Sequence, residues 1–97
     1  IAGIYPGTRA VSDLSSAVLV YQVPQLAEER MTLGLSVLNQ ARQVLVLVTG
    51  GDRAAALSAA LTGTYQPSRL PVQALKPLTG EVALLIDRAA GSGLPAV

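Results

Sequence analysis

The stretch best suited to chemistry is a short turn that contains two glycines and ends on an arginine. This turn, residues 49–53, follows the apolar run of residues 44–48 and precedes a segment rich in alanine and leucine. The pattern predicts a strand covered on both faces, a tight turn and a helix start, with Asp52 as the N-cap and Arg53 in the first turn. The first N–H groups of a helix are unpaired and bind anions, and a guanidinium pairs with phosphate as a planar fork. We therefore expect a phosphate contact at Arg53.

Gly50 and Gly51 are expected to let a ligand approach the backbone at this turn. A plain tight turn before a helix would require the same two residues. The alternative for Arg53 is a solvated side chain in the first helical turn. A cation beside the positive end of a helix is slightly unfavourable, however, and this favours a nearby anion.

The composition excludes several kinds of site. The 97 residues contain no cysteine and no histidine, which rules out disulfides, thiolate metal sites, thiol nucleophiles and imidazole bases within them. With a net charge of +1 and 13% charged residues, the chain has no basic cluster, so nucleic-acid binding is not expected. The apolar runs are too short for a membrane span. We expect a cytoplasmic location and no cofactor or metal.

The elements that must position the turn follow from periodicity, proline and glycine. The expected elements are a loop over residues 1–13 with a turn at 5–8, strands at 17–23, 31–35, 44–48 and 82–86, helices at 36–42 and 53–61, a helical turn at 87–90, and connections at 24–30 and 64–79. Ser36 is the expected N-cap of the first helix, and Gly63 is expected to end the second. Strands that alternate with helices predict an α/β protein with an open, mostly parallel sheet and right-handed crossovers.

A family resemblance covers nearly the whole chain. Residues 29–61, ERMTLGLSVLNQARQVLVLVTGGDRAAALSAAL, and the later EVALLIDRAA resemble the C-terminal half of 6-phosphogluconolactonase. In that family a Pro/Glu-Arg-Ile/Val-Thr-Leu-Thr strand precedes an Asn-x-Ala-Arg helix end, a valine-rich strand and a Thr/Ser-Gly-x-x-Lys turn. The glucosamine-6-phosphate isomerases of the same superfamily have a similar Met-Thr-x-Gly-x stretch. Residues 1–7, IAGIYPG, resemble the part of the catalytic motif Gly-x-Asp-Gly-His-Thr-Ala-Ser-Leu-Phe-Pro-Gly that comes after its histidine.

The resemblance implies that residues 1–97 are the C-terminal portion of a single lactonase/isomerase domain with a Rossmann-like sheet and flanking helices. The complete protein would then hydrolyse 6-phospho-D-glucono-1,5-lactone to 6-phosphogluconate in the oxidative pentose phosphate pathway. Its catalytic Asp and His would lie upstream of Ile1. The expected partners are a sugar-phosphate substrate and the N-terminal half of the same domain, and the 97 residues alone are expected to be inactive.

Three arginines are candidates by this resemblance. Arg53 stands where the family usually has the phosphate-binding lysine. Arg9 could reach the phosphate, because the related isomerases use an arginine from this neighbourhood. Arg30 is either a substrate contact or a structural tether at a strand start, and its neighbours Glu28 and Glu29 favour the tether.

Other polar and aromatic residues have structural interpretations. Asp87 and Arg88 are expected to be surface and capping residues at the end of the last strand, and Tyr5 and Tyr21 to be packing groups.

Two other functions remain open. One is an isomerase or deaminase that acts on glucosamine 6-phosphate, although residues 39–42, NQAR, and the absence of that family's longer insertions favour the lactonase. The other is a non-catalytic α/β module that binds an anion or a partner chain.

Overall fold

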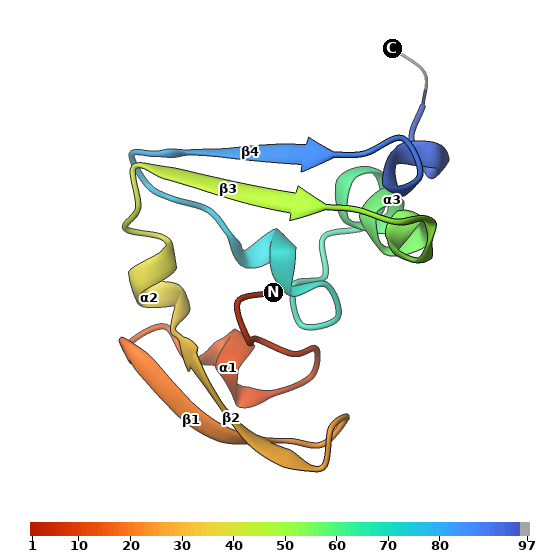
Figure 1. Ribbon diagram of the computed structural model, residues 1–97. Coiled ribbons are helices and arrows are strands. Elements are labelled where there is room, and N and C mark those ends of the chain that lie inside the picture. Colours follow the sequence, from red (N-terminus) through yellow and green to blue (C-terminus); the bar gives the residue numbers. More distant parts are fainter. Residues whose placement is uncertain (96–97) are drawn as a thin grey trace.

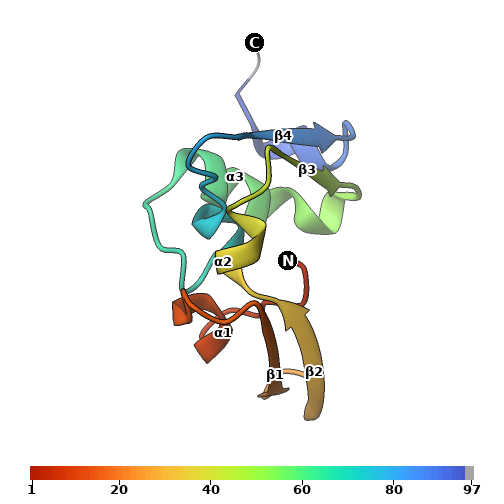
Figure 2. The ribbon, with the colours of Figure 1, turned by 90° about the vertical axis from the view of Figure 1, so that its left-hand side faces the viewer.

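Two small sheets form the two ends of the protein (Figure 1). The structure is a computed structural model that describes residues 1–95. An antiparallel hairpin lies at the bottom of the view and a parallel pair of strands at the top. The N-terminal segment and the short helix α2 (Leu35–Leu38) lie between the two sheets, as the rotated view also shows (Figure 2).

The hairpin consists of β1 (Val18–Val23) and β2 (Glu28–Leu33), which pair along their full lengths. The prediction of a strand that ends before Pro24 is confirmed. The expected connection through residue 30 was wrong, because a turn over residues 24–27 already reverses the chain and β2 begins at Glu28. The turn is closed by the N–H of Leu26 on the carbonyl of Val23 at 3.1 Å, and Ala27 takes a positive φ of 51°.

Helix α1 (Arg9–Ser12) occupies part of the expected N-terminal loop, so the loop prediction was wrong there. The turn that precedes it, at residues 6–7, is confirmed. The Thr8 hydroxyl stabilises this turn by donating to the carbonyl of Tyr5 at 2.7 Å. The helix then buries Ala10 completely against the hairpin core. A single small apolar residue per turn is too weak a periodic signal to distinguish such a helix from a loop.

Helix α2 is shorter than expected and begins one residue earlier. Gly34, not Ser36, is its N-cap, so the predicted cap was wrong. The Ser36 hydroxyl instead donates to the carbonyl of Ser16 at 2.8 Å, which ties the helix to the loop before β1. A long-range acceptor has displaced the local capping bond that serine usually makes.

The parallel pair consists of β3 (Gln43–Val48) and β4 (Glu81–Ile86), in a register that places Val46 opposite Leu84. This confirms the α/β fold with a parallel sheet and flanking helices. Strands β1 and β2 do not join this sheet, contrary to the expected strand order. Their backbone N–H and C=O groups are instead paired with each other.

The chain between β3 and β4 covers one end of the pair. It contains the 3-10 turn η1 (Gly51–Arg53), helix α3 (Ala54–Thr62) and the 3-10 turn η2 (Pro71–Ala74), and η3 (Ala90–Gly93) follows β4. Gly63 ends α3 as predicted. Figure 1 shows both strand arrowheads pointing toward α3 and the turn before it. The carboxyl ends of parallel strands are where α/β proteins place their ligands.

Most fully buried side chains lie beside the hairpin. This core cluster consists of Ile4, Ala10, Leu19, Tyr21, Val23, Leu35 and Leu75. Within residues 1–95, every helix is too short or too polar to cross a membrane.

Candidate functional site

The glycine turn after β3 contains a short 3-10 turn that the sequence did not predict, and this turn precedes helix α3. Residues 51–53 form η1, so α3 begins at Ala54 and Arg53 is its N-cap residue. Asp52 is therefore not the N-cap, and that prediction was wrong. Its carboxylate instead lies 3.5 Å from the Nη1 atom of Arg53, in an exposed contact. The first N–H groups of this helical stretch belong to Gly51 and Asp52, two residues earlier than expected.

Gly50 has a backbone conformation that requires glycine. Its φ is +92°, and a Cβ built there would lie 2.6 Å from a carboxylate oxygen of Asp52. The N–H of Gly50 donates to both carboxylate oxygens of Asp87, at 3.2 and 3.1 Å. The N–H of Gly50 is thus already engaged, and Gly51 carries the next N–H along the turn.

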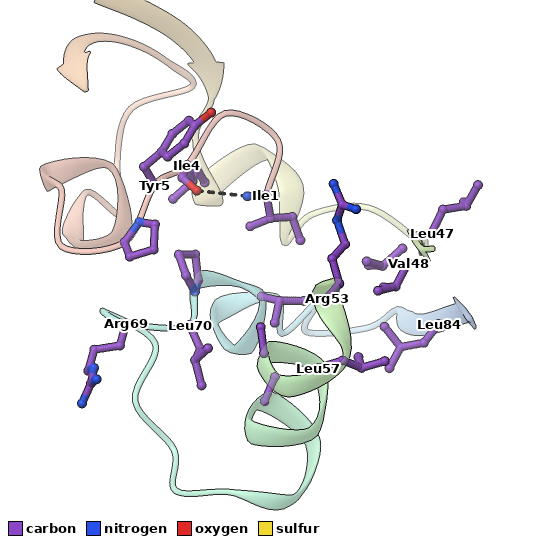
Figure 3. Close-up of a pocket in the computed structure, with 16 residues that line it drawn as sticks. Ile1, Ile4, Tyr5, Leu47, Val48, Arg53, Leu57, Arg69, Leu70 and Leu84 are labelled. Atoms are coloured by element: carbon purple, nitrogen blue, oxygen red, sulfur yellow. Dashed lines mark hydrogen bonds between the residues drawn. The ribbon is translucent and has the colours of Figure 1, made fainter. Parts of the chain in front are cut away.

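Arg53 projects from this turn with its guanidinium exposed. The Nη1 atom donates to the carbonyl of Thr49 at 3.1 Å, which directs the side chain back across the turn. The side chain of Arg53 is 62% exposed, so its remaining N–H groups are accessible to a ligand. Figure 3 shows the guanidinium standing at the rim of a cavity, between Ile1 and Val48.

The cavity beside Arg53 has a volume of about 430 Å³. It lies between the N-terminal segment, β3, α3 and the chain around η2 (Figure 3). Apart from Tyr5 and two arginines, the residues that line it are aliphatic: Ile1, Ile4, Pro6, Val46, Leu47, Val48, Ala56, Leu57, Ala60, Leu70, Pro71, Val72 and Leu84. An apolar cleft with a cation at its edge can hold a ligand that carries one anionic group.

The N-terminal segment forms one wall of the cavity and is held by the hairpin. The Tyr21 hydroxyl donates to the carbonyl of Gly3 at 2.6 Å and accepts the N–H of Tyr5 at 3.1 Å. The Thr32 hydroxyl donates to the carbonyl of Ala2. Tyr21 is buried, as expected of a packing residue, and its hydroxyl also bridges two backbone groups. These bonds fix where the start of the chain lies relative to β3.

The other two candidate arginines are not brought to the cavity. Arg9 donates to the carbonyl of Val20 at 2.6 Å, and its guanidinium carbon lies 5.9 Å from the ring centre of Tyr21. Arg30 pairs with Glu28 at 2.6 Å on the exposed end of the hairpin. The hydrogen bonds that Arg30 donates to Glu28, together with the charge of that carboxylate, raise the pKa of the Arg30 guanidinium above its ordinary value. This geometry favours the tether for Arg30 and a structural role for Arg9.

Two residues of the site carried no signal for it in the sequence. Arg69 lines the cavity from the expected surface connection, although Figure 3 shows its guanidinium turned away from Arg53. The carboxylate of Asp87 accepts the N–H of Ala90, the first residue of η3, at 2.8 Å, although the N-cap residue of η3 is Ala89. The second contact of this carboxylate, with Gly50, joins positions 37 residues apart. A bond over that separation leaves no local pattern.

Comparisons with known proteins agree with one another. Residues 1–84 match the family described as glucosamine-6-phosphate isomerases/6-phosphogluconolactonase. A probable 6-phosphogluconolactonase 2 from Oryza sativa subsp. indica is 34% identical over 77 residues, which are 75% of this chain and 28% of the rice protein. The 6-phosphogluconolactonase of Rattus norvegicus is 33% identical over 88 residues, which are 90% of this chain and 34% of the rat protein.

A solved structure gives the same result. The crystal structure of 6-phosphogluconolactonase from Leishmania guyanensis superposes with a TM-score of 0.78 at 30% identity, over 98% of this chain and 37% of that chain. The chain therefore spans about a third of the length of the proteins that it matches.

Proposed function

Because the chain belongs to the glucosamine-6-phosphate isomerase/6-phosphogluconolactonase family, we propose that it is the C-terminal portion of a domain that opens 6-phospho-D-glucono-1,5-lactone to 6-phosphogluconate. The observation that carries the proposal is the placement of Arg53. It stands at the carboxyl end of a parallel strand, on a glycine turn, at the rim of an apolar cavity. We propose that Arg53 binds the substrate phosphate and that the N–H of Gly51 assists it.

The present partners of Arg53 leave it available for an anion. One is a backbone carbonyl, and the other is the exposed carboxylate of Asp52 at 3.5 Å. An exposed ion pair of this kind contributes little to stability. A phosphate carries up to two negative charges, and two of its oxygens can each accept a hydrogen bond from the planar guanidinium. It is therefore a stronger partner for Arg53 than either of these groups.

Lactone opening also needs a base, and the proposal assigns that base to a segment upstream of Ile1. The base removes a proton from water as the water oxygen attacks the ring carbonyl, and the ring C–O bond then breaks while the protonated base returns that proton to the leaving ring oxygen. The new carboxylic acid loses its proton to solvent and becomes a carboxylate. Ile1 and Arg53 line the same cavity, so a segment joined to Ile1 would enter beside the proposed phosphate contact. The contribution of residues 1–97 is then to bind and orient the sugar phosphate.

The uncovered side of the parallel pair supports the same proposal. Leu45, Leu47 and Leu85 project from one face and are 55%, 70% and 51% exposed. We propose that the rest of the domain packs on this face and pairs with a free edge of the sheet, because parallel sheets are covered on both faces. We also propose that the complete enzyme acts on sugar phosphates in the cytoplasm.

The test is Arg53→Ala in the complete protein that carries these residues. Loss of a hydrogen bond to a charged group should raise KM for the phosphorylated lactone about ten- to a hundredfold. Arg53→Lys should recover most of the activity, because an ammonium still pairs with phosphate. Arg42→Ala is the matched control, since Arg42 is an exposed arginine at the opposite end of β3.

Glucono-1,5-lactone, which lacks the phosphate, separates a binding role from a structural one. Its turnover should not change in Arg53→Ala. Equal losses with both lactones would show that Arg53 is structural. Residues 1–97 alone should open neither lactone above the spontaneous rate. If the complete protein converts glucosamine 6-phosphate but opens neither lactone, the isomerase or deaminase replaces the lactonase.

A further inference from the structure

Asp87 links the ends of the two parallel strands. It follows β4 directly, and its N–H donates to the carbonyl of Val48 at the end of β3, at 3.2 Å. Its carboxylate receives the N–H of Gly50 at 3.2 and 3.1 Å and the N–H of Ala90 at 2.8 Å. One residue therefore joins β3, the glycine turn and η3 by its backbone and side chain together.

The glycine turn depends on such an external contact because its conformation is unusual. Gly50 has a φ of +92°, and glycine loses more backbone freedom on ordering than any other residue. The carbonyl of Gly50 accepts the N–H of Arg53 at 3.3 Å, and the carbonyl of the preceding Thr49 accepts its guanidinium. A rotation at Gly50 would therefore change how these two backbone acceptors lie relative to Arg53.

We propose that Asp87 is a positioning residue for phosphate binding: its carboxylate fixes Gly50, and thereby holds Arg53 at the rim of the cavity. The inference rests on the proposed function, because it assigns Asp87 to the same site. Asp87 acts through the turn and does not touch the substrate.

The carboxylate of Asp87 is negative and would repel a bound phosphate. An effect of Asp87 on the position of the turn can therefore be distinguished from a direct electrostatic effect on the ligand, because the two have opposite signs. A carboxylate near a phosphate repels it, but Asp87 and Arg53 are exposed, and the high dielectric constant of water weakens interactions between exposed charges. The geometric effect of Asp87 on Gly50 should therefore exceed the repulsion. If repulsion were larger, removal of the carboxylate would tighten phosphate binding.

The experiment compares Asp87→Ala with Asp87→Asn in the complete protein. Asparagine keeps an oxygen that can accept the N–H of Gly50, whereas alanine does not. Asp87→Ala should raise KM for the phosphorylated lactone about five- to tenfold, with kcat nearly unchanged, which is the size of effect that one well-oriented hydrogen bond gives. Asp87→Asn should stay within about twofold of the wild type, and neither variant should change turnover of the unphosphorylated lactone. Glu81→Ala is the matched control, because it removes an exposed carboxylate from the opposite end of β4.

Hydrogen exchange gives a second readout that does not need activity. In the wild type the Gly50 amide should exchange slowly, and in Asp87→Asn it should remain protected. A rapidly exchanging Gly50 amide in the wild type would overturn the proposal, even if Asp87→Ala fails to fold. A lower KM in Asp87→Ala, or equal losses with both lactones, would also overturn it. If the wild type opens neither lactone, the proposed function fails. An active wild type with an unchanged Asp87→Ala variant rejects only the role of Asp87.

Discussion

The hairpin end and the parallel-sheet end of the protein differ in how well they bury their apolar residues. In the hairpin, Leu19, Tyr21 and Val23 are all less than 5% exposed. In β3 and β4 no residue is buried, although their sequences are almost wholly apolar. The more hydrophobic of the two sheets is therefore the one without a buried residue.

The difference shows that an apolar strand sequence predicts how many faces of the strand are buried. The residues that bury those faces need not belong to the same 97 residues. Strand β1 alternates exposed and buried positions, which suits a sheet with one covered face, and residues 1–38 supply most of that cover. The continuous run of β3 suits a sheet covered on both faces. Only the face of Val44 and Val46 packs against the core here, and Leu45 and Leu47 remain exposed.

The largest expected effect contrasts one leucine from each end. Leu35 is 1% exposed and Leu47 is 70% exposed. Leu35→Ala should lower the free energy of unfolding by about 2–5 kcal/mol, because it leaves a cavity in a closed core. Leu47→Ala should change it by less than about 0.5 kcal/mol in residues 1–97. Urea unfolding of both variants measures the contrast.

The same pair sharpens the comparison in the complete protein. If the rest of the domain covers β3, Leu47→Ala should there cost about as much as Leu35→Ala. A Leu47 substitution that remained neutral in the complete protein would show that this face stays open to solvent. A large loss in residues 1–97 alone would show that the face is covered by some other contact.

An intermediate effect is expected at the tyrosine that clamps the N-terminal segment. Tyr21→Phe removes a buried hydroxyl that bridges the carbonyl of Gly3 and the N–H of Tyr5. Leaving these two backbone groups without a partner should lower the free energy of unfolding by about 1–3 kcal/mol. Faster exchange of the Tyr5 amide should accompany the loss, while amides of β3 and β4 should be unaffected. Equal acceleration in both sheets would mean that the two ends do not open independently.

The sequence predicted the parallel sheet better than the hairpin. The strands at residues 44–48 and 82–86 were found within one residue of their ends, because a short run of valine and leucine between turn signals has few other interpretations. The start of β2 was missed because Glu28, Glu29 and Arg30 are polar on both faces of the strand. Their strand conformation comes from pairing with β1, which is not a local property.

For the candidate site, the sequence predicted the turn but not what holds it. The glycines and Arg53 lie together in the chain, so their pattern was visible, and the role of Arg53 in phosphate binding stays a prediction. The bond from Gly50 to Asp87 and the bridge through Tyr21 join residues far apart in the chain. Such contacts depend on how the strands are placed, and a single sequence does not encode that placement locally.

The smallest expected effect is a pH dependence confined to the hairpin end, at the loop between α1 and β1. The Asp13 carboxylate accepts the N–H groups of Ser16 and Ser15, both at 2.9 Å, and the Ser16 hydroxyl at 2.7 Å. These hydrogen bonds, led by the N–H of Ser16, lower the pKa of Asp13 from 3.8 to about 2. Since the pKa is lower in the folded state, the ionised carboxylate stabilises folding above about pH 4, and this contribution is lost as the pH falls from about 4 to about 2. Asp13→Asn should therefore be less stable than the wild type near neutral pH and should converge with it near pH 2. Urea unfolding of both proteins between pH 2 and 6 measures the difference, from which the other carboxylates cancel because both proteins contain them. A difference that stayed constant across this range would show that the charge of Asp13 does not contribute.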